Sequence, residues 1–169
     1  MEQQIIFRDM NLEDLEMMVA WRNEEDVKKY YGNPSFDYSH EYIINKYKPR
    51  ILKEDKKVPI IIEYEHEPIG YLQFYTLEKE EILKITNGKS SEVGSFDLFI
   101  GSSKHRNKGL GTIITRKLIT KFEENRGIHH IVIKVLSNNH RAIKCYEKCG
   151  FRIRGQENNR NLILMEYKR

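Results

Sequence analysis

The chain contains 169 residues, of which 39% are hydrophobic and 32% are charged, and its formal net charge at pH 7 is +4. This length and composition predict a single globular domain over residues 1–169 and argue against a linker or a low-complexity tract. The sequence lacks an apolar run long enough for a membrane span, and its first ten residues lack the pattern of a signal peptide. We therefore expect a cytoplasmic protein without membrane contacts.

The first half of the chain is predicted to form three strands, at residues 5–7, 58–64 and 69–77, and two helices, at residues 12–21 and 38–52. Asn11 and Asp14 are spaced as a capping pair for the first helix. The two later strands are separated by a short segment that contains His66 and Pro68. This turn signal indicates an antiparallel hairpin.

The second half begins with polar residues 78–91, which are expected to form an irregular excursion between strands. It continues with predicted strands at residues 93–100, 130–136, 151–156 and 161–167 and predicted helices at residues 109–125 and 139–149. Apolar residues from Leu110 to Phe122 recur at helical spacing and give the longer helix one apolar face. The predicted order is β-α-α-β-β-β-α-β-α-β-β, without internal repeats.

A glycine turn precedes the helix at residues 109–125. Gly109 and Gly111 allow backbone conformations that other residues avoid, and they lie where the first N–H groups of a helix lack intrahelical partners. The partial positive charge of a helix N-terminus favours a phosphate, and Lys104, Arg106 and Lys108 add positive charge. The pattern predicts a phosphate site, with a plain strand-to-helix turn as the alternative. Complete Walker and dinucleotide-binding motifs do not occur here.

Charge is unevenly distributed along the chain. Residues 104–148 carry a surplus of eight positive charges, whereas residues 1–103 carry an excess of seven negative charges. The predicted phosphate site therefore lies in the most basic part, and the acidic remainder suits a cationic second ligand. An interspersed, solvated surface would give the same asymmetry. The basic residues do not form a long stripe interleaved with aromatic residues, so we do not expect nucleic acid as a partner.

Two sequence motifs carry a resemblance to a known family. Residues 106–111 read Arg-Asn-Lys-Gly-Leu-Gly and fit the pattern Q/R-x-x-G-x-G/A, and residues 139–151 fit the pattern N-x-x-A-x-x-x-Y-x-K-x-G-F. In both motifs the chain resembles the GCN5-related N-acetyltransferases (GNAT). The predicted order of elements fits the same family over essentially the whole chain. The resemblance implies an α+β GNAT fold: a mixed, mostly antiparallel central sheet flanked by helices, with splayed fourth and fifth strands that form an acetyl-CoA cleft.

A narrower similarity is carried by four segments, at residues 67–75, 96–101, 108–112 and 141–148, and by Trp21 with Tyr31 and Gly32. In these residues the chain is similar to the aminoglycoside 6′-N-acetyltransferases. One difference concerns the acceptor side of the site. Those enzymes commonly have Gln after the acidic residue of the fourth strand, whereas here Leu98 follows Asp97.

The resemblance implies that acetyl-CoA is the cofactor and that coenzyme A is a product. We expect no metal, because two thiolates make an incomplete zinc site and the histidines lack the spacing of metal ligands. The residues expected to bind the cofactor are Leu98, Phe99, Ile100, Arg106, Asn107, Lys108, Gly109, Leu110, Gly111, Thr112, Asn139 and Ala142. Main-chain N–H groups of the fourth strand are expected to stabilise the carbonyl oxygen as it gains negative charge. The alternative for that segment is an ordinary buried strand.

Two residues are expected to move protons. The resemblance implies that Tyr146 protonates the departing sulfur, and packing within an amphipathic helix is the alternative. Asp97 lies in an otherwise apolar strand, so it is expected to orient the substrate amine or accept its proton, with a salt bridge to a neighbouring element as the alternative. Asn139 is expected to form a hydrogen bond with the pantetheine arm, to cap its helix, or to do both.

The expected acceptor is a small cationic amine, with the 6′-amine of an aminoglycoside favoured, and its acetylation would confer antibiotic resistance. The residues expected to bind it are Trp21, Glu25, Asp26, Tyr71, Glu92 and Asp97, with Glu24, Glu63 and Glu65 as further acidic candidates. Solvated surface is the alternative for each acidic side chain. A polyamine, a peptide N-terminus or a metabolite amine is an alternative acceptor, and a CoA-binding regulatory module without turnover is an alternative class. Cys145 and Cys149 are expected to serve in packing. The protein is expected to be a monomer or a homodimer.

Overall fold

The computed structural model describes residues 4–86, 92–157 and 161–169. The chain forms two compact units. The first unit comprises Met1–Phe74 and Asp97–Lys108, and the second comprises Tyr75–Phe96 and Gly109–Arg169. Within the described ranges, none of the helices combines the length and the apolar character that a membrane span requires.

The first unit is built on antiparallel strands. Its elements are β1 (Ile5–Asp9), η2 (Leu12–Asp14), α1 (Leu15–Asn23), α2 (Glu25–Tyr31), α3 (His40–Ile51), β2 (Val58–Tyr64), most of β3 (Glu67–Thr76), the end of β4 (Gly94–Ile100) and η3 (Ser103–His105). Strand β2 pairs with β1 on one side and with β3 on the other, and Glu65 and His66 make the β2–β3 turn with positive φ angles. The predicted antiparallel hairpin is confirmed.

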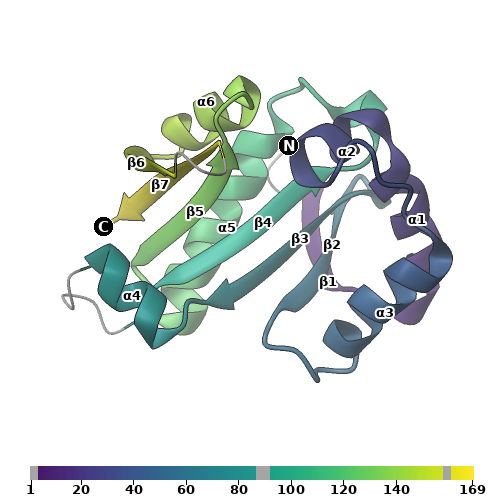
Figure 1. The fold of residues 1–169 in the computed structure, drawn as a ribbon, viewed down its shortest axis with the longest axis horizontal. Coiled ribbons are helices and arrows are strands. Elements are labelled where there is room, and N and C mark those ends of the chain that lie inside the picture. Colours follow the sequence, from purple (N-terminus) through teal and green to yellow (C-terminus); the bar gives the residue numbers. More distant parts are fainter. Residues whose placement is uncertain (1–3, 87–91, 158–160) are drawn as a thin grey trace. The chain divides into compact units, whose positions relative to one another are not determined.

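Helices α1, α2 and α3 lie together beside the strands of the first unit (Figure 1). Their apolar side chains meet those of the strands in one buried cluster, which contains Met18 and Trp21 of α1, Tyr47 of α3, Ile61 of β2 and Phe99 of β4. Burial of these large side chains stabilises the packing because it removes apolar area from water. The cluster thereby fixes the ends of β3 and β4 against the three helices.

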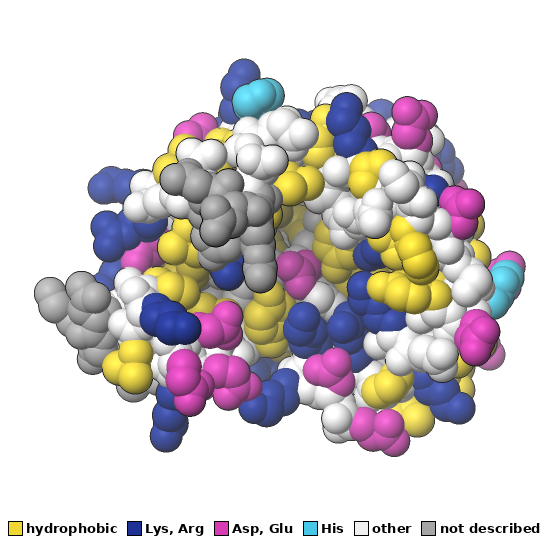
Figure 2. Space-filling view, in the orientation of Figure 1, with side chains coloured by type: hydrophobic (Ala, Val, Ile, Leu, Met, Phe, Trp, Pro, Cys, Tyr) yellow, Lys and Arg dark blue, Asp and Glu magenta, His cyan; other side chains and the backbone are white. Residues whose placement is uncertain are grey.

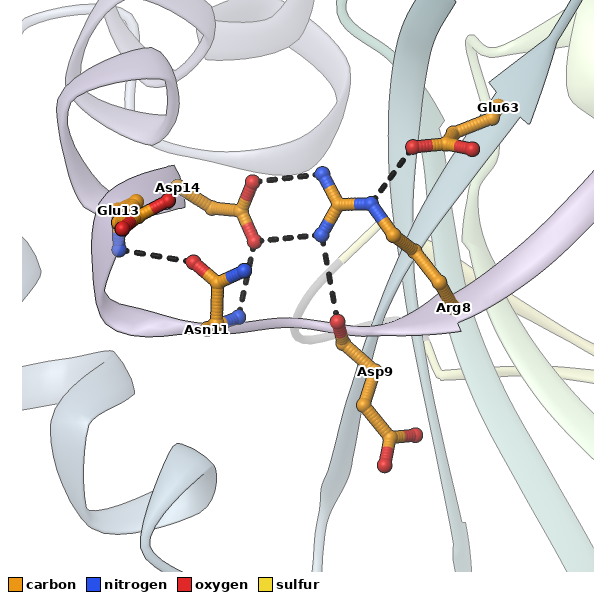
Figure 3. A network of polar contacts seen from close by, with 6 residues as sticks. All are labelled: Arg8, Asp9, Asn11, Glu13, Asp14 and Glu63. Carbon is orange, nitrogen blue, oxygen red and sulfur yellow. Dashed lines mark hydrogen bonds and ion pairs between the residues drawn. The ribbon is translucent and has the colours of Figure 1, made fainter. Parts of the chain in front are cut away.

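A polar network joins β1, η2 and β2 (Figure 3). Both nitrogens at the tip of Arg8 donate to the carboxylate of Asp14 at 2.8 Å, and Arg8 Nε donates to Glu63 at 2.6 Å. Asp14 also accepts from the backbone N–H of Asn11, whose side chain accepts from Glu13 N, so the predicted capping pair is present. The network holds the start of the helical region on the first two strands.

The second unit contains the start of β4, α4 (Lys79–Thr86), α5 (Leu110–Arg126), β5 (His130–Leu136), α6 (His140–Lys148), β6 (Arg152–Glu157) and β7 (Leu162–Lys168). Strand β4 pairs parallel with β5 at Gly94 and Ile131, while β7 pairs antiparallel with both β5 and β6. Helix α5 packs so closely on β4 that a Cβ atom at Gly94 would lie 2.8 Å from the Phe122 ring. This position requires a residue without a side chain.

The mixed α+β class with mostly antiparallel pairing is confirmed, and the described strands and helices lie close to their predicted bounds. The predicted order is wrong at two places because it omits α2 and α4. Helix α2 has only seven residues, too few to show a clear helical period, and Glu24 caps it by accepting from Val27 N. Helix α4 occupies part of the expected excursion, where Ile82 packs on Val93 and Val132. Asn87 and Gly88 of that excursion lie outside the described residues.

Candidate functional site

Asp97, on the part of β4 that belongs to the first unit, is held by a neutral amide. Gln73 of β3 donates its side-chain N–H to Asp97 Oδ2. The amide oxygen of Gln73 accepts from Arg50 Nη1 at 2.6 Å and from the Tyr71 hydroxyl at 2.9 Å. Because the oxygen of Gln73 has two donors, its N–H group is directed at the carboxylate. The predicted acidic residue of β4 is therefore fixed in position by residues of β3 and α3.

The charges around Asp97 are mostly positive. Burial, followed by the nearby charges of Arg22, Arg50 and Lys57, lowers the pKa of Lys46 to about 8, and Asp97 acts in the opposite direction. The pKa of Tyr31 lies well above its usual value because the ring is buried and because Asp97 is negative. In Figure 2, the part of the surface over α1–α3 shows Lys and Arg side chains next to Asp and Glu side chains. The acidic excess along residues 1–103 therefore does not describe the surroundings of Asp97.

Aromatic rings cover the same part of the first unit. The ring of Phe99 lies 4.7 Å from Tyr31, 5.6 Å from Tyr71 and 6.2 Å from Trp21, measured between centroids. Trp21 also packs against Gly101, where a Cβ atom would lie 2.3 Å from the indole. Trp21 and Tyr71 were predicted to bind substrate, and the structure places both in the buried cluster next to Phe99.

Arg106 of the cofactor motif binds acidic residues of its own unit. Its guanidinium donates to Glu24 at 2.6 and 2.9 Å, to Asp26 at 3.2 Å, and to the carbonyl oxygens of Ile100 and Gly101 at 2.8 Å. The bonds to Arg106 outweigh burial and lower the pKa of Glu24. The side chain of Arg106 thus ties the segment after β4 to the start of α2. Glu24 and Asp26, predicted as substrate contacts, hold this arginine.

The glycine turn has the backbone conformation that its sequence predicts. Asn107 and Gly109 have φ angles of 61° and 78°, and Gly109 is the N-cap of α5. Such left-handed angles are easy for glycine and tolerated by asparagine. Asn107 and Lys108 end the first unit, and Gly109 begins the last segment of the second unit. Inside that unit, a Cβ atom at Gly111 would lie 3.3 Å from Cys145 Sγ, so a larger residue would crowd α6.

Helix α6 of the second unit contains the other predicted cofactor residues. Asn139 is its N-cap, and the Asn139 side chain accepts from Ala142 N at 3.2 Å. Tyr146 is buried, and its ring packs on Phe96 at 5.8 Å and on Phe151 at 5.7 Å. The capping and packing alternatives are therefore both present. The roles of Asn139 and Tyr146 toward a ligand stay predictions.

The two cysteines of α6 lie beside the start of α5. Cys145 Sγ is 3.5 Å from Thr112 Oγ1, and Cys149 Sγ is 3.5 Å from the carbonyl oxygen of Thr112. The hydrogen bond with Cys149 lowers the pKa of Cys145 to about 6, and the same bond raises that of Cys149. Among the residues that the structure describes, no cluster of three or more His, Cys, Asp or Glu could hold a metal ion.

The remaining predicted residues divide into two groups. Glu25 and Glu92 are exposed, and Leu98 and Ile100 are half-buried on either side of the buried Phe99. Four further residues near Asp97 were not predicted from the sequence: Gln73, Arg50, Arg22 and Lys46. A signal existed for Gln73, because it stands two positions after Tyr71 in a strand and therefore faces the same side of the sheet.

Comparison with known proteins gives the family. Residues 11–158 match the family model described as acetyltransferase (GNAT) domain. Aminoglycoside N(6′)-acetyltransferase type 1 of Klebsiella pneumoniae is 27% identical over 151 residues, which cover 89% of this chain and 75% of that protein. Acetyltransferase PseH of Campylobacter jejuni is 22% identical over 147 residues, or 87% of this chain and 82% of that protein.

Solved structures agree with the sequence matches. The structure of aminoglycoside acetyltransferase AAC(6′)-Ib in complex with paromomycin and acetyl-CoA superposes with a TM-score of 0.82 and 25% identity, covering 98% of this chain and 94% of that chain. Its complex with ribostamycin and coenzyme A gives a TM-score of 0.81 at the same identity and coverage. Because the family model spans most of the residues and both motifs occur in the expected elements, the chain belongs to the GNAT acetyltransferases.

Proposed function

We propose that the chain acts as one N-acetyltransferase domain over residues 1–169, which transfers the acetyl group of acetyl-CoA to a primary amine. The 6′-amine of an aminoglycoside is the first candidate acceptor, and such an activity would confer antibiotic resistance. The relatives named above support this acceptor. The observation that carries the proposal is Asp97, a carboxylate on β4 that accepts a hydrogen bond from the neutral amide of Gln73.

Asp97 would prepare the amine for attack. Its Oδ2 accepts from Gln73, so we assign proton acceptance, directly or through a water molecule, to Oδ1. A half-buried carboxylate also attracts an ammonium group before that group loses its proton. The new bond joins the amine nitrogen to the acetyl carbon, and the bond from that carbon to sulfur breaks.

Main-chain N–H groups and a phenol would serve the two other requirements of the reaction, which are to stabilise the carbonyl oxygen and to protonate the departing sulfur. N–H groups in the segment from Leu98 to Ile100 would stabilise the carbonyl oxygen, since fixed donors cost little reorganisation as charge develops. Tyr146 would give its hydroxyl proton to the departing sulfur. Acetyl-CoA supplies the activated thioester.

The residues of the glycine turn fit a diphosphate. Gly109 has a φ angle of 78°, and a Cβ atom there would meet no neighbouring atom. The position therefore favours glycine because of its backbone conformation and not because of a lack of space. The N–H groups of Thr112 and Ile113 bond to the carbonyl oxygen of Gly109, which closes the first turn of α5. The N–H groups before them point along the helix axis and suit an anion. We assign the cofactor's diphosphate to residues 106–112, with Asn139 and Ala142 near the pantetheine arm.

A direct test is to incubate the protein with acetyl-CoA and kanamycin or tobramycin and to follow coenzyme A release and acetylated product by mass spectrometry. Acetylated antibiotic is the expected result. If aminoglycosides are not acetylated but another primary amine is, the acceptor assignment is wrong and acetyl transfer stands. Calorimetric binding of acetyl-CoA without transfer to any amine would instead favour a regulatory CoA-binding module.

A small amine of another class is the second candidate acceptor, and the positive charges of Arg22, Lys46 and Arg50 near Asp97 favour it over a polycation. We also propose a cytoplasmic location, which suits the free thiols of Cys145 and Cys149, and a monomeric or homodimeric state. Fractionation of the producing cell and light scattering of the purified protein test these two proposals.

A further inference from the structure

The guanidinium of Arg22, on α1, is buried with donors left over. The residue is 2% exposed, and its Nε and Nη1 have no hydrogen-bond partner among the described residues. The group lies over the rings of Tyr38 and Tyr31, at 4.3 and 4.9 Å from their centroids. Contact with rings offsets part of the cost of burying the charge, but it does not satisfy the two N–H donors. Unsatisfied buried donors in native proteins often mark the place of a water molecule or an ion.

A second unsatisfied donor comes from the neighbouring helix. The hydroxyl of Tyr47, on α3, is fully buried and also has no hydrogen-bond partner within the described part of the chain. Arg22 and Tyr47 are close enough for each to influence the pKa of the other. Lys46 precedes Tyr47, and its ammonium lies 5.8 Å from the centroid of the Tyr47 ring. Three side chains from two helices therefore offer donors in one place.

The side chains around Arg22, Lys46 and Tyr47 supply little negative charge to balance the two cations. Arg50 is already bound to Gln73 and to Asp55, the latter at 3.2 Å. Asp97 accepts from Gln73 and favours the charged form of Lys46, whereas Arg22, Arg50 and Lys57 oppose it. An oxyanion would satisfy the leftover donors and balance the positive charge. A polycation would meet repulsion from the same side chains.

We propose that Arg22, Lys46 and the hydroxyl of Tyr47 bind an acidic group, a carboxylate or a phosphate, on the acceptor amine. The protein then acetylates small amines that carry an acidic group, with the amine at Asp97 and the acid at these donors. The inference rests on the proposed acetyl transfer. It is an alternative to the aminoglycoside acceptor, whose several ammonium groups the same side chains would repel.

Arg22 and the Tyr38 ring that covers it are both buried, so the proposed binding includes a movement of that ring. The ring of Tyr38 packs on Phe36 and Tyr42 at 4.9 and 5.2 Å, and these two partners are 40% and 36% exposed. The ring of Tyr38, which covers Arg22, is therefore in contact with two rings that reach the surface, and the half-buried Lys46 lies 5.5 Å from the centroid of the Tyr42 ring. Lys46 is the donor that an entering anion meets first.

The test compares acceptors that differ only in the acidic group. Lysine is paired with cadaverine, which lacks the carboxylate, and phosphoethanolamine is paired with ethanolamine, with kanamycin as a fifth acceptor. For at least one pair we expect the acidic member to have a kcat/KM at least tenfold higher. The pair that responds distinguishes a carboxylate from a phosphate. Equal values within both pairs, in a protein that acetylates kanamycin, would overturn the anion site and leave the proposed function intact.

Variants assign the preference to the named residues. Lys46→Gln and Arg22→Gln should remove the preference for the acidic member by raising its KM tenfold or more, with little change for the member without the acid. Lys48→Gln, at an exposed position of the same helix, is the matched control and should keep the preference. A preference that survives both Lys46→Gln and Arg22→Gln overturns the assignment.

A thermal melt separates a binding role from a structural one. Because two donors of Arg22 are unsatisfied, Arg22→Met should keep or raise the Tm while it abolishes the acid preference. If that variant is strongly destabilised, Lys46→Gln decides the matter. If none of the acceptors is acetylated, the proposed function fails, and calorimetric titration with the same four paired amines tests the anion site alone. Tighter binding of an acidic member that is lost in Lys46→Gln supports the site, and equal binding overturns it.

Discussion

The surroundings of Asp97 in the first unit and the surroundings of Tyr146 in the second are built in different ways. Asp97 is fixed by polar side chains from separate elements, through Gln73 on β3 and Arg50 on α3. Tyr146 is fixed by ring packing on Phe96 and Phe151, and the turn before α5 relies on the backbone of Gly109. A site made of backbone and local packing leaves a motif in the sequence, whereas a site made of distant side chains does not.

The largest expected effect comes from Asp97→Asn, which keeps the size of the side chain and removes its negative charge. We expect kcat to fall by about 10²–10⁴-fold, the range that general acid–base groups contribute, with little change in the Kd for acetyl-CoA. Steady-state kinetics with the best acceptor and calorimetry with acetyl-CoA measure the two quantities. Unchanged kcat in this variant would remove Asp97 from the mechanism.

Gly109→Val tests the backbone-built site. A β-branched residue at a φ of 78° costs about 1–2 kcal/mol or more, and the turn relaxes to avoid it. The Kd for acetyl-CoA should rise by roughly tenfold or more, since the N–H groups would no longer be aligned on a diphosphate. Gly155→Ala is the control because a Cβ atom there meets open space. Equal binding by the wild type and Gly109→Val would contradict the phosphate assignment.

Gln73→Leu tests whether Asp97 needs its amide partner. The change removes the donor to Asp97 and leaves the bonds of Arg50 and Tyr71 unmade, so we expect a loss of about 1–3 kcal/mol in the free energy of unfolding. We also expect kcat to fall by about tenfold with little change in the Kd for acetyl-CoA. Gln73→Glu separates position from charge, because it keeps the shape and adds a repulsive carboxylate. Wild-type kinetics in both variants would show that Gln73 serves the fold alone.

The smallest effect on catalysis is expected from Asp14→Asn, in the network of Figure 3. Burial acts to raise the pKa of Asp14, but the bonds from Arg8 and Asn11 N outweigh it, and the pKa lies below its usual value. The stabilisation is therefore present above the unfolded-state pKa and is lost as pH falls through the folded-state pKa. Urea unfolding should show a loss of about 1–2 kcal/mol at pH 7 that disappears in acid, with normal kinetics. A change in kcat would link this network to the site.

Much of the fold could be predicted because its signals are local. The capping pair Asn11 and Asp14, the apolar face of α5 and the hairpin turn each depend on a few neighbouring residues. Helix α2 escaped prediction because its seven residues are mostly polar and its cap is a glutamate rather than one of the usual capping residues.

In the site, too, the features that depend on neighbouring residues could be predicted, and those that depend on distant residues could not. The turn from Arg106 to Gly111 was visible as a motif, although the Arg106 side chain proved to bind Glu24 and Asp26. Strand alternation places Gln73 on the same side of the sheet as Tyr71, but the bonds that join Asp97, Gln73 and Arg50 could not be predicted, because β4, β3 and α3 come together only in the folded chain. Net charge counted along residues 1–103 could not predict the basic surroundings of Asp97 either, since many acidic side chains there are paired or exposed elsewhere.

The pair of thiols beside Thr112 has a practical consequence for enzymology. The hydrogen bond with Cys149 lowers the pKa of Cys145 and the thiol is partly exposed, so Cys145 should react with the disulfide dyes used to detect released coenzyme A. A colour assay would then record the protein's own thiol as a burst equal to the enzyme concentration. The same reaction can serve as a reporter, because a dye attached next to Gly111 would compete with a bound nucleotide, and labelling should slow as acetyl-CoA saturates the protein.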